Sequence, residues 1–136
     1  MARVEYITRE SMRPLLEPYG LSEAVKANGT LTIAGQTGID ASHQVVSGGL
    51  KAQALQAFRN IREIIALAGA RPEDLIHLTW YLVEGSAPRT FLEDALDVTA
   101  AREEAFPGLK PGSTAVRVKA LLMPEILVEI QSVVAL

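Results

Sequence analysis

The sequence of 136 residues contains no cysteine, and this absence removes several chemistries from consideration. A disulfide framework, a thiolate zinc site and a cysteine nucleophile all require that residue. Histidine is nearly as scarce, because only His43 and His77 are present and neither has carboxylates at the spacing of metal ligands. We therefore expect no bound metal.

Long apolar runs and clusters of basic residues are also missing. No stretch approaches the roughly 18 to 20 apolar residues that span a bilayer, and the first residues lack the apolar run of a signal peptide. The net charge is -3, and the 13 Lys and Arg residues are scattered along the chain. We expect a cytoplasmic protein that binds no membrane and for which nucleic acid is a poor candidate as partner.

Apolar residues, in contrast, are plentiful, at 49% of the sequence. A chain of this length buries roughly two thirds of its unfolded surface, which is enough for one hydrophobic core. No repeat, low-complexity tract or long linker is visible, and the only extended irregular stretches expected are residues 8–22 and 38–48. We predict a single domain over residues 1–136.

Two amphipathic helices are predicted. Residues 50–68 carry apolar side chains at helical spacing, and Gly69 followed by Pro72 ends the pattern. The second helix begins near residue 88 and ends at residue 106, because Thr90 with Glu93 forms a capping box, with Ser86 as an alternative cap one turn earlier. Both helices therefore have one face to bury.

Strands are predicted where apolar residues alternate with polar ones, at residues 75–83, 113–118 and 127–135. Shorter candidates are residues 4–7, 24–27 and 31–36, the last two joined through the turn signal Asn28-Gly29. The fold class is α+β, with a sheet of five or six strands and both helices on one face. We expect the last two strands, 113–118 and 126–135, to lie in the middle of the sheet as an antiparallel hairpin that turns near residues 122–125.

The face of the sheet that the helices leave open is predicted to be mixed in character, too polar for a closed core and too apolar for open solvent. We infer a subunit interface, a ligand cleft or both. The alternation assigns to this face His77, Thr79, Tyr81, Ser113, Ala115, Arg117, Glu129 and Gln131.

Glu129, in the middle of the last strand, is the strongest candidate for chemistry. A carboxylate there is either half of a structural ion pair or a general acid or base with a perturbed pKa. Arg117 is its natural partner if the two strands form a hairpin. His77 has no Ser, Asp or Glu beside it in sequence, so a structural role is favoured for it.

Several short motifs follow one another in a specific order through nearly the whole chain. They are Pro18-Tyr19 with Ala24-Val25 and Gly29, then Ala34-Gly35-Gln36-Thr37-Gly38-Ile39-Asp40, Gln53 through Asn60 to Ala68-Gly69-Ala70, Thr79-Trp80-Tyr81-Leu82-Val83 and Val128-Glu129-Ile130. Through these motifs the chain resembles the Rid family, also called YjgF or reactive intermediate deaminases and formerly L-PSP endoribonuclease-like proteins. The resemblance implies a chorismate-mutase-like fold, a homotrimer and three small-molecule clefts between subunits.

What the resemblance implies about activity is hydrolysis of 2-aminoacrylate or a related imine to a keto acid and ammonia, without a cofactor. By position, Tyr19 corresponds to a cleft tyrosine, Gly35 to a backbone contact with the ligand, and Glu129 to the glutamate that holds the water. The family's carboxylate-binding arginine corresponds to Ser113, and Ala115 stands where many members have cysteine.

Because serine replaces that arginine, the hold on a small carboxylate should weaken by about ten- to a hundredfold, and activity on 2-aminoacrylate is doubtful. Arg117 is a substitute only for a longer or differently placed ligand, since four residues along a strand span about 13 Å. Two functions remain open: an imine or enamine deaminase of non-standard substrate, and a non-catalytic trimer that binds a metabolite or has a regulatory role. Ribonuclease activity ranks last.

Overall fold

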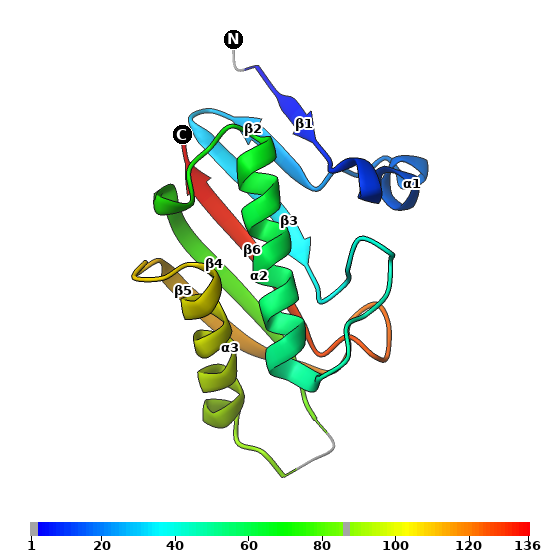
Figure 1. The fold of residues 1–136 in the computed structure, drawn as a ribbon, viewed down its shortest axis with the longest axis vertical. Helices are drawn as coiled ribbons and strands as arrows, with labels where there is room; N and C mark the ends of the chain where they lie inside the picture. The colour runs from blue at the N-terminus through cyan, green and yellow to red at the C-terminus, as the bar shows by residue number, and fades with distance from the viewer. Residues whose placement is uncertain (1–2, 86–87) are drawn as a thin grey trace.

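The computed structural model describes residues 3–85 and 88–136, and in them one mixed sheet of six strands is the main element (Figure 1). The strand order is β1-β2-β3-β6-β4-β5. The strands are β1 Glu5–Ile7, β2 Ala24–Ala27, β3 Thr30–Gln36, β4 Leu75–Val83, β5 Gly112–Val118 and β6 Val128–Ala135. Each agrees within two residues with the range that the alternation predicts.

The helices also form where the sequence predicts them. Helix α2 covers Gly49–Leu67, and Gly69, with a φ of +72°, follows its end. Helix α3 covers Phe91–Ala105 and is capped by Thr90, whose hydroxyl accepts a hydrogen bond from the Glu93 N–H at 3.1 Å. The alternative cap, Ser86, lies outside the described residues.

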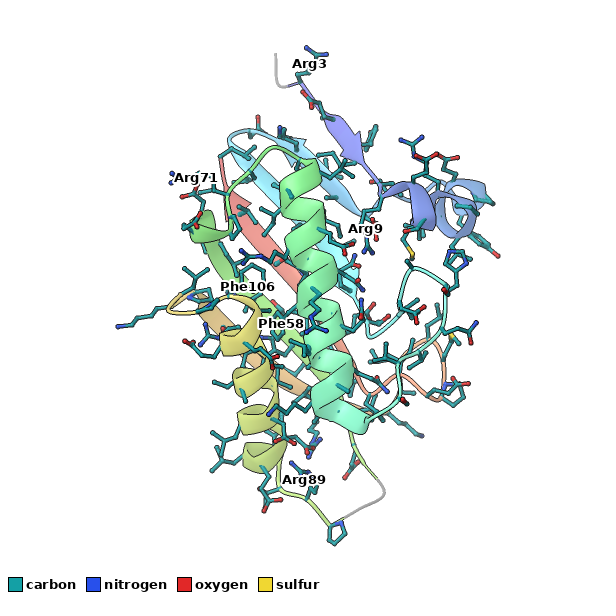
Figure 2. All side chains as sticks on the ribbon, in the orientation of Figure 1. Arg3, Arg9, Phe58, Arg71, Arg89 and Phe106 are labelled. Atoms are coloured by element: carbon teal, nitrogen blue, oxygen red, sulfur yellow. The ribbon has the colours of Figure 1, made fainter. Side chains whose placement is uncertain are left out.

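Helices α2 and α3 lie side by side on one face of the sheet, as Figure 1 shows, and the core fills the space between. The ring of Phe58 from α2 meets that of Phe106, just after α3, edge to face at 6.2 Å (Figure 2). The predicted α+β class with two helices on one face is therefore confirmed. The largest buried apolar side chains are Leu31, Ile33, Phe58, Ile61, Ile64, Ile65, Leu78, Leu82, Phe106 and Ile130.

The position of β5 differs from the prediction. Strand β6 is central, antiparallel to both β3 and β4, but β5 lies at the edge of the sheet and pairs in parallel with β4. The physical reason is the connection: β4, α3 and β5 form a strand-helix-strand crossover, and a crossover delivers its second strand parallel to the first. The predicted hairpin between the last two strands is wrong.

The parallel register also corrects the assignment of faces. Ser113, Ala115 and Arg117 pair with Leu78, Trp80 and Leu82, so they belong to the face that the helices cover. On the open face the prediction is confirmed for Tyr81 and Glu129, which are direct partners, and for His77, Thr79 and Gln131. Strand β5 contributes Thr114 and Val116 to that face instead.

A second local correction concerns Ile76, which the alternation places with the core. A bulge between Leu75 and His77 interrupts the pairing of β4 with β6 and leaves Ile76 49% exposed.

The segment before β2 is more regular than predicted. Three helical turns follow β1 directly: Glu10–Met12, α1 over Arg13–Leu16, and Glu17–Tyr19. Pro14 and Pro18 stand in the first turns of the latter two, where the missing N–H costs nothing. Within residues 3–85 and 88–136, no helix has the length and apolar character needed to cross a membrane.

Candidate functional site

A cavity of about 510 Å³ opens beside the end of β3, and Glu129 contributes to its wall. Three segments that are far apart in sequence surround it: the helical turns before β2, the end of β3 with the residues after it, and the loop that leads into β6. Of the residues predicted for the site, the cavity brings together Gly35 and Glu129.

Glu129 lies on the open face of β6, and among residues 3–85 and 88–136 its carboxyl group has no hydrogen-bond or ion-pair partner. Tyr81 is directly opposite it, but the tyrosine hydroxyl donates to Oε1 of Gln131 at 2.9 Å. Burial raises the pKa of the Glu129 carboxyl above its ordinary value, and within the described part of the chain no counter-charge offsets that effect. A carboxyl group in this state can accept or donate a proton closer to neutral pH than an exposed glutamate can.

Gly35 allows this carboxylate to pack against the backbone of β3. A Cβ added at Gly35 would lie 2.7 Å from both Cδ and Oε1 of Glu129, closer than real contacts allow. The pairing of β3 with β6 is irregular between Ile33 and Gln36, which is where a bulge displaces the backbone around Gly35. The present position of the Glu129 side chain therefore depends on a glycine here, although the φ of Gly35 itself would admit another residue.

Arg9 contributes the cavity's positive charge, but carboxylates already hold its guanidinium. Its Nη2 donates to Glu23 at 2.7 Å and its Nη1 to Glu63 at 2.9 Å. The Nε–H also points at Glu23, at 3.0 Å, and Nη1 reaches Oδ1 of Asn60 at 3.1 Å. Figure 2 shows Arg9 between the N-terminal segment and α2. Since Glu23 is only 2% exposed, this ion pair is a buried structural link.

Asn60 of α2 holds one side of the cavity. Its Nδ2 donates to the backbone carbonyls of Thr37 at 3.1 Å and Ile39 at 3.0 Å, which fixes the chain just after β3. The side chain is 3% exposed, so these bonds are sheltered from water.

Gln53, two turns earlier on the same helix, holds the opposite side. Its Nε2 donates to the carbonyl of Glu125 and its Oε1 accepts from the N–H of Leu127, both at 2.9 Å. The prediction from sequence did not find this role. The available signal was that Gln53 and Asn60 are polar yet follow the buried stripe of α2, at i and i+7 with Ala57 between them.

Three other predicted site residues lie apart from the cavity. Tyr19 is 79% exposed, Ser113 is exposed on the edge strand and Ala115 is half-buried. None of them is among the residues that line the cavity beside Glu129. Their roles in substrate binding stay predictions.

Arg117 contacts helix α3 and not Glu129, so the predicted ion pair is wrong. Its Nη1 lies 2.7 Å from Oδ2 of Asp94, and its guanidinium lies 5.1 Å from the centre of the Phe91 ring. Arg89 approaches the other Asp94 oxygen at 2.7 Å. Burial alone would raise the pKa of Asp94, but the hydrogen bonds from both arginines outweigh it and lower that pKa. Arg117 lines a separate cavity of about 650 Å³ between the starts of α2 and α3.

Within residues 3–85 and 88–136, no group of three or more His, Asp or Glu side chains is placed to hold a metal ion.

Comparison with known proteins identifies the family. The sequence profile described as Endoribonuclease L-PSP matches residues 13–136. The chain belongs to the Rid/YjgF family. Among relatives of this Rid-family chain, a RutC family protein of Pyrococcus horikoshii is 33% identical over 130 residues, covering 95% of each chain. The mouse protein named 2-iminobutanoate/2-iminopropanoate deaminase is 33% identical over 105 residues, which are 76% of this chain and 71% of the mouse protein.

Solved structures of Rid proteins share the fold. RidA from an Antarctic Psychrobacter has a TM-score of 0.74 at 31% identity and covers 85% of this chain and 88% of its own. The Rid-family protein YyfA from Yersinia pestis has a TM-score of 0.82 at 23% identity, covering 98% and 100%. The mixed six-stranded sheet is therefore the family's architecture.

Proposed function

We propose that this Rid-family chain hydrolyses an imine or enamine to a carbonyl compound and ammonia in the cavity beside Glu129. The observation that carries the proposal is the Glu129 carboxyl group, whose pKa burial raises and which packs over Gly35 at the cavity wall. The deaminase names of the mammalian relatives favour the same class of reaction.

The proposed reaction needs one water molecule and one proton-carrying group. The water oxygen bonds to the imine carbon while Glu129 takes a proton from the water, and the electrons of the C=N double bond move to nitrogen. Glu129 then gives that proton to nitrogen, which yields a carbinolamine. Glu129 next takes the hydroxyl proton of the carbinolamine and passes it to nitrogen, the C–N bond breaks, and the products are a carbonyl group and ammonia. A carboxyl group with a raised pKa suits these transfers. No cofactor takes part in this scheme.

The test is ammonia release from a panel of imines that amine and amino-acid oxidases generate in place, measured above the spontaneous rate. Glu129→Gln should abolish the enzymatic part. Glu125→Gln is the matched control, since it removes the same charge from an exposed position four residues away and outside the cavity lining. If no imine is hydrolysed faster than in buffer, or if Glu129→Gln retains full activity, this function is excluded.

The second candidate is a trimer that binds a small metabolite or has a regulatory role without catalysis. It is favoured by Ser113, which by the family resemblance replaces the arginine that holds the substrate carboxylate. A compound that raises the melting temperature but yields no ammonia would support this candidate. A ligand at one hundred times its Kd adds about 2.7 kcal/mol of stability, which a thermal scan resolves.

We also propose that the open face of the sheet is covered in a homotrimer whose cavities lie between subunits. Val116 is 39% exposed on this face, next to Tyr81 of β4. Val116→Arg should therefore dissociate the assembly in sedimentation experiments. The matched control is Leu92→Arg, because Leu92 is 68% exposed on α3, on the other side of the sheet. A trimer that tolerates arginine at Val116 would contradict this arrangement.

A further inference from the structure

The cavity beside Glu129 has a largely apolar lining supplied by two segments. One is the turn around α1, with Met12, Leu15 and Leu16, and the other is the loop before β6, with Leu121, Leu122 and Met123. Several of these side chains are open to solvent, above all Leu122 at 94% exposure. Apolar side chains that surround a cavity and remain exposed gain free energy when an apolar ligand covers them.

The charges around the cavity disfavour an anion. Arg9 is the single cation among the lining residues that the structure describes, and its side chain is 13% exposed. Two carboxylates, those of Glu23 and Glu63, already bind its guanidinium. A third carboxylate from a ligand would have to displace Glu63, whose side chain is 65% exposed, or take the place of Glu23 and leave that buried glutamate without its partner.

Glu129 adds to this bias because it lines the cavity and, in the part of the chain that the structure describes, has no positive partner. A ligand carboxylate placed beside it would raise the cost of ionising both groups, whereas a protonated nitrogen would be attracted. A ligand that fits the cavity thus has one polar group, which donates a hydrogen bond or carries a positive charge. The rest of such a ligand is hydrocarbon, which matches the apolar lining.

We propose that the cavity takes a ligand with a branched alkyl or aryl chain and a neutral or protonated C=N or amine group, and without a carboxylate. The proposal rests on the proposed function only for the C=N group. The hydrocarbon chain would lie against the leucine and methionine side chains of the two segments, and the nitrogen would point to Glu129.

Binding to the intact wild-type protein tests the proposal without requiring turnover. The probes are methyl isobutyl ketone, the keto acid in which a carboxylate replaces its methyl group, and isoamylamine, each titrated by calorimetry. We expect the ketone and the amine to bind about tenfold or more tightly than the keto acid. A keto acid that binds as tightly as the ketone, or a failure of all three probes to bind, would overturn the proposal.

Two variants separate the contributions. Glu129→Gln should lower the affinity for isoamylamine and raise the affinity for the keto acid, because it removes the negative charge and keeps the shape of the side chain. Leu122→Ser should lower the affinity for the ketone severalfold. It should leave the fold intact, since the Leu122 side chain is almost fully exposed. If neither variant changes any affinity, the ligands bind elsewhere and the assignment of this cavity is wrong.

These results are distinguishable from a failure of the proposed function. Ketone and amine binding without ammonia release from any imine would support this ligand class and exclude the hydrolysis. Efficient hydrolysis of imines that carry a carboxylate would support the hydrolysis and exclude this ligand class.

Discussion

Two glycines at the end of β3 provide a sharp test of how the site is built. Neither Gly35 nor Gly38 has a positive φ, so an alanine at either position meets no backbone strain of its own. What differs is the neighbour that the new methyl group would meet. At Gly35 it would meet the side chain of Glu129 at 2.7 Å, and at Gly38 it would meet Cα and Cβ of Gln53, also at 2.7 Å.

The expected stabilities follow from what each neighbour can do. Glu129 is unpaired within the described residues, so its side chain can rotate away at a cost of about 0.5 to 1.5 kcal/mol. Replacing glycine by alanine also reduces the conformational entropy of the unfolded chain, which stabilises the folded state by about 0.4 to 1 kcal/mol and offsets much of that cost. The Cα and Cβ atoms of Gln53 are held in place by the backbone of α2 and cannot rotate away. Overpacking there costs about 1 to 3 kcal/mol, and distortion of its two hydrogen bonds adds about 1 kcal/mol each.

We therefore expect Gly35→Ala to change the free energy of unfolding by less than about 1 kcal/mol and Gly38→Ala to lower it by roughly 3 kcal/mol. Urea unfolding followed by the fluorescence of Trp80, at a fixed protomer concentration, measures both. Gly35→Ala should nevertheless abolish ammonia release, because the Glu129 carboxylate has moved. A Gly35→Ala variant as unstable as Gly38→Ala would refute the reasoning, since it would mean that Glu129 is rigidly held.

Three further predictions concern single side chains. Burial raises the pKa of Glu129, so its ionisation destabilises the fold as pH rises from the ordinary carboxyl range through the raised pKa. Glu129→Gln should accordingly be more stable than the wild type at pH 8, as urea titrations measure, and this advantage should disappear below the ordinary pKa. Arg117→Ala should lower stability by about 1 to 3 kcal/mol, because buried Asp94 loses one of its two arginines, while ammonia release continues. Gln53→Ala should cost about 2 to 3 kcal/mol, because two backbone groups of the loop before β6 lose their partners.

Each of these has a clear contrary result. A pH-independent difference between Glu129→Gln and the wild type would mean that the carboxyl group is solvated in the folded state. If Arg117→Ala lost ammonia release at unchanged stability, the result would mean that this arginine takes part in the reaction. A Gln53→Ala variant as stable as the wild type would show that the loop before β6 needs no support from α2.

The sequence by itself determined the elements and the chemistry of their faces. Periodicity is a local property, so the alternation in residues 75–83 and the helical stripe of residues 50–68 are readable without the fold. The capping box at Thr90, the turn at Asn28-Gly29 and the position of Glu129 on the open face were predicted for the same reason. Family resemblance added Gly35, whose role depends on a neighbour that no local pattern names.

Only the tertiary structure decided which faces meet. The crossover through α3 places β5 parallel to β4 at the edge of the sheet, and this single change of direction moves Arg117 from Glu129 to Asp94. Register decides such contacts, because a strand's side chains alternate and their partners depend on the pairing with its neighbour. The cavity likewise exists because α2 binds the backbone on both of its sides through Gln53 and Asn60. These contacts join residues up to 74 positions apart, a separation over which periodicity in the sequence carries no information.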